Sequence, residues 1–294
     1  MARRDDLTDG LSPEVRRRRI VAIGLFVVAA AVAAGVSFAA VHRHSTPPPP
    51  PPPAPPRPFR IVFPEGFTRA KMALRVRDVA RIADNEHRGH VRLSENAYLA
   101  ASKQAVVPCF GRKVQRNLEG FLFPATYDFL TTTTAKQLVH AQIQAFCHNW
   151  AKVGLGYATS KNLTSSDVLK IASMIEGEAA VAKERPLIAA VIYNRLHDRM
   201  QLGIDATLRY GLHIPPTQSI TNSELASSNP FNTRKFFGLP PTPISNPGLA
   251  SLKAAAHPAQ VDYLYFVRKP DHRHDFFTAS QAAFDQYLAT HGYK

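Results

Sequence analysis

The chain has 294 residues, of which 45% are hydrophobic and 20% charged, which is enough for one or two globular domains. Its formal net charge is +14, yet no aromatic-basic RNA signature and no DNA-binding motif accompanies that charge. The composition therefore argues against nucleic acid as a partner and favours an anionic polymer or lipid surface.

A segment without charges, Ile20 to Val41, is long enough to cross a bilayer as a helix. Arg3, Arg4 and the run 16–19 precede it, whereas few basic residues follow it closely. The positive-inside rule then predicts a cytoplasmic tail over residues 1–19, a transmembrane helix over 20–41 and an extracytoplasmic remainder. A cleaved signal peptide is the alternative, but the apolar run is longer than a typical signal. The sequence predicts a single-pass protein of the cell membrane.

Residues 42–58 contain ten prolines and are predicted to be a linker. Such a run adopts an extended polyproline II form of about 3.1 Å per residue and acts as a semi-rigid spacer. A disordered tether is the alternative, and neither reading identifies what the spacer reaches. From residue 61 on, 27 Lys and Arg outnumber 18 Asp and Glu, which suits an anionic envelope polymer.

Residues 59–107 are predicted to form a small module. The stretch "RIVFPEGFT" alternates apolar residues and then breaks at Pro64-Glu65-Gly66, which indicates a strand followed by a turn. The stretch "TRAKMALRVRDVARIA" carries apolar residues at helical spacing, and Ser94 is suited to cap a second helix. This opening resembles a LysM-like module, a glycan-binding βααβ fold. A small packing subdomain without a binding role is the alternative.

Residues 108–294 are predicted to form a mixed α+β domain. Residues 117–129 read as a loop or short strand, 132–147 as an amphipathic helix, and 262–267 as a strand. Helices are also predicted to start at Thr164, which can form a capping box with Asp167, and near Pro186. The two cysteines, Cys109 and Cys147, lie in the exported part, where a disulfide is permitted but not required.

The helix after Thr164 carries the unusual stretch "IASMIEGEAA". Glu176 falls at the edge of the apolar stripe, while Glu178, two residues on, lies about 200° around the helix. The two carboxylates therefore do not act as a pair on a regular helix, which favours one special carboxylate at Glu176 suited to general acid–base work. The alternative is a solvated helix end with Gly177 as its C-cap.

A long irregular tract after residue 200 supplies polar groups suited to sugar hydroxyls, and tracts of this length are usually functional. Its candidate binding residues are Gln201, Asp205, Tyr210, Asn232, Thr233 and Asn246. Neither an H-E-x-x-H nor a C-x-x-C pattern occurs, so no metal site and no cofactor is predicted. A G-x-S-x-G nucleophile elbow is also missing from the sequence.

Several motifs together resemble the YceG-like family, the endolytic murein transglycosylases of the MltG type. They occur in this order: "LEGFLFPATYDF", "IASMIEGEAA", "VIYNRL", "LGIDATLRYG", "FNTRKFFGLPPTPISNPGLASLKAAAHP" and "DYLYFV". The resemblance runs from about residue 60 to 290 and is most specific after residue 117. The sequence departs from the family pattern at three places. Ala125 stands in the "FPATY" element where an acidic residue is common, Ala282 and Ala283 stand where a Glu-His pair is expected, and "FNTR" replaces the commoner N-T-Y.

The resemblance implies endolytic cleavage of nascent peptidoglycan glycan strands without water. Glu176 would protonate the glycosidic oxygen after a MurNAc unit and then take the proton of that sugar's C6 hydroxyl as a 1,6-anhydro ring closes. Residues at matching motif positions are expected to support substrate binding: Glu119, Glu178, Asn194, Gln201, Asp205, Tyr210, Asn232 and Thr233. Wall-synthesis enzymes are expected as partners.

Two other functions remain open at this stage. A non-catalytic peptidoglycan-binding scaffold of the wall-synthesis machinery would use the LysM-like module and the basic surface. An ordinary hydrolase of the same polymer would need a second carboxylate to position water, and Asp205 is the candidate for that role.

Overall fold

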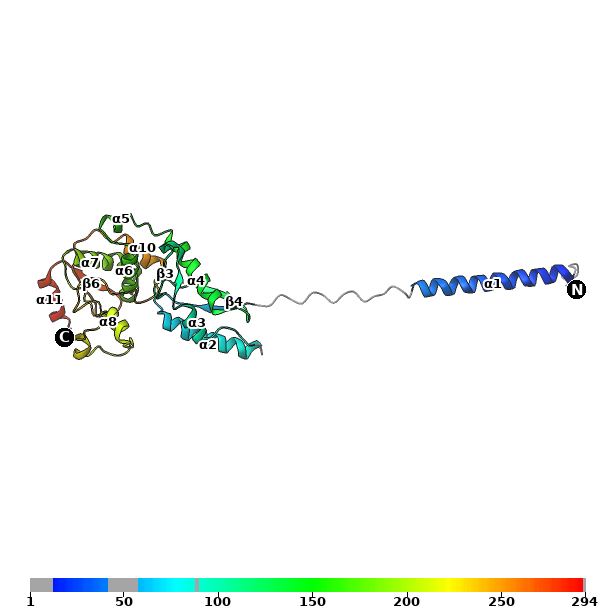
Figure 1. Ribbon diagram of the computed structural model, residues 1–294, viewed down its shortest axis with the longest axis horizontal. Coiled ribbons are helices and arrows are strands. Elements are labelled where there is room, and N and C mark those ends of the chain that lie inside the picture. Colours follow the sequence, from blue (N-terminus) through cyan, green and yellow to red (C-terminus); the bar gives the residue numbers. More distant parts are fainter. Residues whose placement is uncertain (1–12, 42–57, 88–89, 293–294) are drawn as a thin grey trace, which may run out of the picture. The chain divides into compact units, whose positions relative to one another are not determined.

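The computed structural model describes residues 13–41, 58–87 and 90–292, and the chain divides into two units, residues 1–55 and 56–294. The first unit contains helix α1 (Pro13–Val41) (Figure 1). Over Pro13–Ser37 this helix is long and apolar enough to cross a membrane, with a mean hydropathy of 2.5 in its most apolar window. The predicted span 20–41 therefore falls on a helix, whereas the predicted linker, apart from Pro58, lies outside the described residues.

The second unit combines helices with short strands, as predicted for an α+β fold (Figure 1). Its first elements are β1 (Phe59–Val62), α2 (Arg69–His87), α3 (Glu95–Ala101), β2 (Ala105–Val106), η1 (Pro108–Phe110), β3 (Val114–Gln115), β4 (Thr126–Phe129) and α4 (Ala135–Trp150). They are followed by α5 (Gly156–Ser160), α6 (Ser165–Glu178), η2 (Ala182–Glu184), α7 (Arg185–His197), α8 (Asp205–Leu212), α9 (Asn222–Leu225), α10 (Leu249–Ala256), β5 (Tyr265–Arg268), β6 (Asp275–Thr278) and α11 (Gln281–Thr290).

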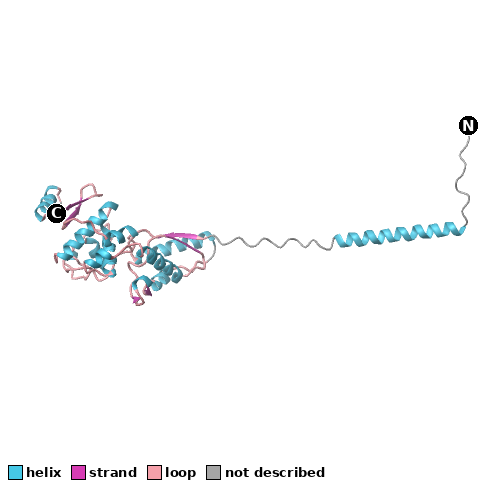
Figure 2. Ribbon diagram, turned by 90° about the horizontal axis from the view of Figure 1, so that it is seen from above, coloured by secondary structure: helices cyan, strands magenta, loops and turns pink. Residues whose placement is uncertain are grey.

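The strands of the described residues form three separate antiparallel pairs, β1–β4, β2–β3 and β5–β6. Figure 2 shows these pairs as short ribbons set apart from one another among the helices. In the first pair Phe59 lies opposite Phe129, and their rings stack with centroids 5.4 Å apart. The helices therefore carry most of the packing, and no continuous sheet organises the described part of the unit.

The first strand pair joins segments on both sides of residue 107. Strand β1 pairs with β4, and α2, α3 and the short β2–β3 pair with η1 lie between them in the sequence. Apart from that short pair, the order is strand–helix–helix–strand, which we call the βααβ unit. Tyr98 of α3 is fully buried and donates a hydrogen bond of 2.7 Å to Gln142 of α4. A βααβ unit that starts at residue 59 thus needs residues up to 129, so the predicted boundary at 107 falls between its paired strands.

Helix α6 lies at the centre of the second unit and packs against α7, α8 and α10. Thr164 and Asp167 form the predicted capping box, because each side chain accepts the backbone N–H of the other residue. The apolar face of α6 is almost completely buried: Val168, Leu169, Ile171, Ala172, Met174 and Ile175. This burial fixes the rotation of the helix and therefore the direction in which Glu176 points.

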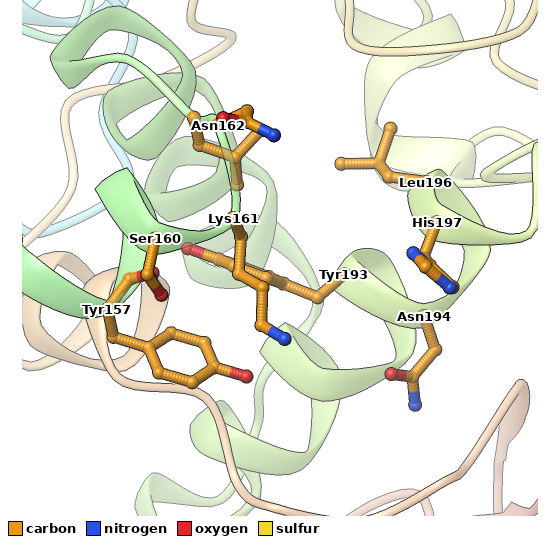
Figure 3. A pocket seen from close by; sticks show the side chains of 9 residues that line it. Tyr157, Ser160, Lys161, Asn162, Tyr193, Asn194, Leu196 and His197 are labelled. Atoms are coloured by element: carbon orange, nitrogen blue, oxygen red, sulfur yellow. The ribbon is translucent and has the colours of Figure 1, made fainter.

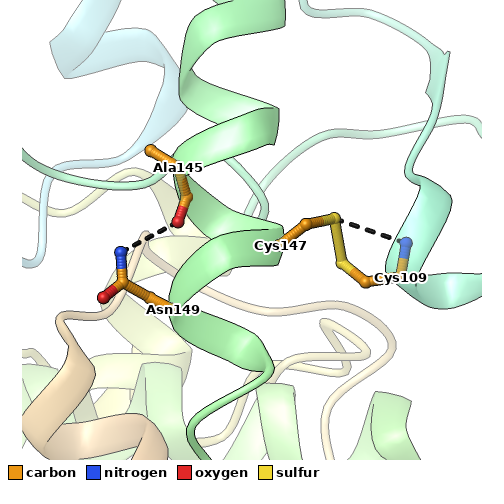
Figure 4. Close-up of a disulfide and its surroundings, with 4 residues drawn as sticks. All are labelled: Cys109, Ala145, Cys147 and Asn149. Carbon is orange, nitrogen blue, oxygen red and sulfur yellow. Dashed lines mark hydrogen bonds between the residues drawn. A yellow bond between two sulfur atoms is a disulfide. The ribbon is translucent and has the colours of Figure 1, made fainter.

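A disulfide joins Cys109 of η1 to Cys147 of α4, with their Cα atoms 5.5 Å apart (Figure 4). The pairing that the sequence left open is thus formed in the structure. The bridge lies beside a cluster of aromatic rings in which Phe110 contacts Phe121, Phe146 and Trp150. It therefore ties a loop of the second unit to the helix against which that loop packs.

Candidate active site

Glu176 is on the last turn of α6, and its side chain is only 7% exposed. One carboxylate oxygen, Oε2, accepts a hydrogen bond of 2.9 Å from the backbone N–H of Gly248. The other, Oε1, is 3.5 Å from the Nη2 atom of Arg185. Two partners from distant parts of the chain therefore hold the carboxylate in one orientation at the rim of the apolar face.

Arg185 connects three helices at this point. It is the first residue of α7, it pairs with Glu176 of α6, and its Nε atom donates a hydrogen bond of 3.0 Å to the hydroxyl of Ser251 on α10. Its side chain is 15% exposed. A planar guanidinium suits such a role, because its several N–H donors have fixed directions.

The loop of residues 244–248 brings the N–H of Gly248 to Glu176. Asn246 is completely buried, and its side-chain oxygen accepts the backbone N–H groups of Gly120 and Leu122, each at 2.9 Å. Its side-chain nitrogen donates to the carbonyl of Phe67 and to Glu119. A buried amide whose donors and acceptor are all engaged in this way is a rigid anchor.

A cavity of about 500 Å³ opens beside Gly177, the exposed residue between the two glutamates. Its lining comes from the turn before α2, from α6 and from α8, and includes Gly66, Lys71, Glu119, Gly177, Arg209 and Tyr210. Gly177 also lies close to α8, because a Cβ atom at this position would be 3.1 Å from the Cβ atom of Ala206. Two of the predicted binding residues, Glu119 and Tyr210, line this same cavity.

Glu119 is 3% exposed and accepts three hydrogen bonds. Its Oε1 atom accepts the backbone N–H of Arg69, at the start of α2, and the side-chain amide of Asn246, each at 2.8 Å. Its Oε2 atom accepts the hydroxyl of Tyr210 at 3.2 Å. Burial nevertheless dominates and raises the pKa of Glu119 to about 7.

Glu178 points away from this cavity and toward α8, as its place on the helix predicts. Its carboxylate accepts the backbone N–H of Ala206 at 3.4 Å, and Arg268 of β5 donates a hydrogen bond to its backbone carbonyl. Burial raises the pKa of Glu178 to about 7, and the charge of Asp205 acts in the same direction. Glu178 therefore supports the first turn of α8, where a carboxylate is favourable.

Asp205 is the first residue of α8, and Gln201 lies four residues before it. Asp205 forms an ion pair of 2.6 Å with Arg234, and both side chains are more than two-fifths exposed. Gln201 donates a hydrogen bond of 3.2 Å to the backbone carbonyl of Lys235. Both residues thus connect the start of α8 to the segment around residue 235.

Asn232 and Thr233 are 0% and 2% exposed, and both bind backbone groups. The amide of Asn232 donates to the carbonyls of Leu225 and Ser227, and the hydroxyl of Thr233 accepts the N–H of Ile204 at 3.0 Å. The structure therefore gives these two residues a role in holding the irregular tract. Direct contact with a substrate stays a prediction for both.

Asn194 lies at a different cavity, also of about 500 Å³, between the C-terminal half of α7 and residues 157–163, which belong to α5 and the segment after it (Figure 3). Its amide donates to the carbonyls of Val261 and Tyr263, each at 2.9 Å. Tyr157 and Lys161 line the same cavity, and the ammonium group of Lys161 lies 5.6 Å from the centre of the tyrosine ring. Of the predicted binding residues, Glu119 and Tyr210 thus line the first cavity and Asn194 lines the second, whereas the others line neither of these two.

Three residues around Glu176 had no place in the sequence-based site: Glu65, Arg185 and Gly248. Glu65 stands in the "PEG" turn, which the sequence marks only as a turn. Burial raises the pKa of Glu65, and the nearby charge of Glu176 raises it further. The sequence marks Arg185 only as part of a helix start. For Gly248 no side-chain signal exists, because its contribution is a backbone N–H.

The chain resembles known proteins over most of its length. A model of the YceG-like family matches residues 40–289. An "Endolytic murein transglycosylase" of Bacillus subtilis (strain 168) is 36% identical over 163 residues, which are 54% of this chain and 44% of that protein. A protein of the same name from Streptococcus pneumoniae (strain ATCC BAA-255 / R6) is 34% identical over 181 residues, 59% of this chain and 32% of that protein.

The match to these curated relatives thus spans less than half of their length. Among solved structures, a crystal structure of a yceG-like protein from Listeria monocytogenes superposes with a TM-score of 0.65 at 29% identity. That superposition covers 78% of this chain and 75% of the Listeria chain. On the extent of the family match, the chain belongs to the YceG-like family.

Proposed function

We propose that this chain is a lytic transglycosylase that cuts peptidoglycan glycan strands at internal positions and leaves 1,6-anhydro-MurNAc ends. The observation that carries the proposal is the setting of Glu176, a nearly buried carboxylate held by Gly248 and Arg185 at the end of a core helix. The similar proteins of Bacillus and Streptococcus are named endolytic murein transglycosylases, which supports the same activity for this chain.

Glu176 performs both proton transfers of the proposed reaction. In its protonated form it gives its proton to the glycosidic oxygen as the bond from that oxygen to the anomeric carbon of MurNAc breaks. The C6 hydroxyl of the same sugar then attacks that carbon and returns its proton to the Glu176 carboxylate. No water is consumed, and the enzyme regains its starting state.

A single acid–base residue is sufficient because the substrate itself supplies the nucleophile. This agrees with the placement of Glu178, which supports α8 through Ala206 and is directed away from the cavity. In the hydrolase alternative Asp205 would position water, but its carboxylate is engaged by Arg234. A hydrolase is therefore the less favoured reading of the site.

The cavity beside Gly177 is the proposed binding place for part of the glycan. Glu119 and Tyr210 offer hydrogen-bonding groups there, and Lys71 and Arg209 give it a positive charge. Positive charge suits the carboxylates of the lactyl and peptide groups on MurNAc. The other predicted binding residues are proposed to support the site from further away: Glu178, Asn194, Gln201, Asp205, Asn232 and Thr233.

Helix α1 is proposed to anchor the chain in the cell membrane, with the N-terminus in the cytoplasm and the second unit outside. The apolar helix and the arginines before it support this orientation. The βααβ unit of residues 59–129 is proposed to be a LysM-like module that binds glycan, with β2, η1 and β3 as an insertion before its last strand. The antiparallel pairing of β1 with β4 and the two helices after β1 support this proposal. Wall-synthesis enzymes are the proposed partners.

The experiment is a digest of purified glycan strands by the full-length protein in detergent, with mass analysis of the ends produced. The wild type should release anhydro-ended fragments, and Glu176→Gln should release none while it remains folded at the assay temperature. Glu86→Gln is the matched control, because Glu86 is an exposed residue of α2 and should cut like the wild type. Normal cutting by Glu176→Gln would refute the assignment.

Two other outcomes would point to the alternatives. Fragments heavier by two hydrogens and an oxygen would identify a hydrolase. Tight binding of the strands without any new ends would identify a peptidoglycan-binding scaffold.

A further inference from the structure

We propose that Glu65 is a second carboxylate of the reaction centre, which contacts the sugar ring at the bond that Glu176 breaks and stabilises the positive charge on its anomeric carbon. This inference rests on the proposed function. It assigns a catalytic role to the turn before α2, in the βααβ unit, rather than to the core helix that carries Glu176.

The two carboxylates meet at Gly248. Its backbone N–H binds Glu176 at 2.9 Å, and the space where a Cβ atom would stand is taken by Glu65, whose Oε1 atom lies 1.8 Å from that position. A Cβ atom lies about 2.5 Å from its own backbone nitrogen, so the nearest oxygens of the two carboxylates are at most about 7 Å apart. Only glycine at position 248 leaves room for this arrangement.

The turn that carries Glu65 is fixed to the loop that carries Gly248. The N–H of Gly66 binds the carbonyl of Asn246 at 2.9 Å, and the N–H of Asn246 binds the carbonyl of Phe67 at 3.0 Å. Gly66 has a φ of +77°, a conformation that favours glycine, and a Cβ atom there would lie 3.5 Å from the Cγ atom of Glu176. The position of Glu65 beside Glu176 is therefore set by the backbone.

Glu65 differs from Glu176 in its exposure. Residue 65 is exposed overall, whereas the side chain of Glu176 is 7% exposed and paired with Arg185. Glu65 is thus the more accessible of the two residues to a glycan strand, although its carboxylate packs against Gly248 and is partly buried. The charges that act on Glu65 are those of Glu176 and Arg185.

Such a carboxylate has a defined use in this reaction. When the bond to the leaving sugar breaks, the anomeric carbon acquires positive charge, as in other glycosidic cleavages. A negative charge that is already in place stabilises this transition state more than the ground state, and therefore raises kcat. The proton balance is unchanged, because both transfers still involve Glu176 and the substrate.

The test compares Glu65→Gln, Glu65→Asp and the control Glu86→Gln as full-length proteins in detergent, with kcat and KM measured on glycan strands. Glu65→Gln keeps the shape and removes the charge, so kcat should fall about 100-fold with little change in KM. Glu65→Asp keeps the charge and should restore part of the lost rate. All variants should unfold at the wild-type temperature, because Glu65 is exposed.

A kcat for Glu65→Gln within about threefold of the wild type would overturn the inference. So would a loss confined to KM, which would assign Glu65 to ground-state binding. If the proposed function itself were wrong, the wild type would produce no anhydro ends, which distinguishes that outcome from a wrong role for Glu65. If wild type and Glu65→Gln both produce them at equal rates while Glu176→Gln does not, only the role of Glu65 is wrong.

Discussion

The carboxylate of Glu176 accepts a hydrogen bond from the backbone N–H of Gly248, at 2.9 Å and across 72 residues of chain. Gly248 is also the N-cap of α10, so the negative charge lies at a helix N-terminus, where it is stabilised. Arg185 completes the setting from the start of α7. The candidate acid is thus positioned by the ends of three helices and not by its neighbours in sequence.

Removal of Arg185 should destabilise the fold chiefly through Glu176. Arg185→Met leaves the buried carboxylate without its cation, and breaking such a pair costs about 3 to 5 kcal/mol. In a Glu176→Gln background the same substitution should cost much less, because no charge is left unpaired. Urea unfolding of the four proteins measures the coupling, with Arg77→Met, in an exposed ion pair, as the control. Equal costs in both backgrounds would mean that the pair contributes nothing.

Gly248→Ala should reduce activity by moving the carboxylate of Glu65 without removing its charge. The added Cβ occupies the place of the Glu65 carboxylate, which is the flexible end of an exposed side chain and can move aside. Stability should therefore change little, while kcat falls toward that of Glu65→Gln. The double variant Gly248→Ala with Glu65→Gln should be no slower than either single variant. Rate losses that multiply would show that the two substitutions act independently.

Stability should decrease as pH rises from about 5 to about 8. Burial raises the pKa of Glu119 from 4.5 to about 7, so between these values the folded chain holds a proton that the unfolded chain has lost. The free energy of unfolding then falls with rising pH in this window, by about 3 kcal/mol at most for this one group. Glu178 acts in the same direction.

Glu119→Gln should flatten this dependence, because glutamine imitates the protonated form. Thermal unfolding between pH 5 and 8 provides the measurement, and the variant should be more stable than the wild type at pH 8. The exposed substitution Glu86→Gln serves as the reference. An unchanged pH slope in Glu119→Gln would mean that Glu119 does not titrate in this window.

Loss of the disulfide should destabilise the second unit. The bridge closes a loop with a sequence separation of 38 residues, for which the chain-entropy estimate is about 4 kcal/mol. The variant with alanine at both Cys109 and Cys147 should lose about 2 to 4 kcal/mol in urea unfolding. A reducing agent should destabilise the wild type to a similar degree and leave this variant unaffected. A wild type that is insensitive to the reducing agent would contradict the expectation.

Local features of the structure were predictable from the sequence because they depend on neighbouring residues. The capping box of Thr164 and Asp167, the buried face of α6 and the separation of Glu176 from Glu178 all follow from helical geometry. The family motifs likewise stand in the chain as contiguous stretches. The βααβ unit was only partly predictable, because β1 pairs with β4 across a long insertion that carries no pairing signal.

The sequence by itself determined the helix, the position of the special glutamate on it and the family to which the chain belongs. Only the tertiary structure decided what surrounds that glutamate: the N–H of Gly248, the guanidinium of Arg185 and the second carboxylate at Glu65. The physical reason is that periodicity and caps act within a few residues. A backbone donor, or a charge brought in by a distant turn, becomes part of the site only when the core has packed.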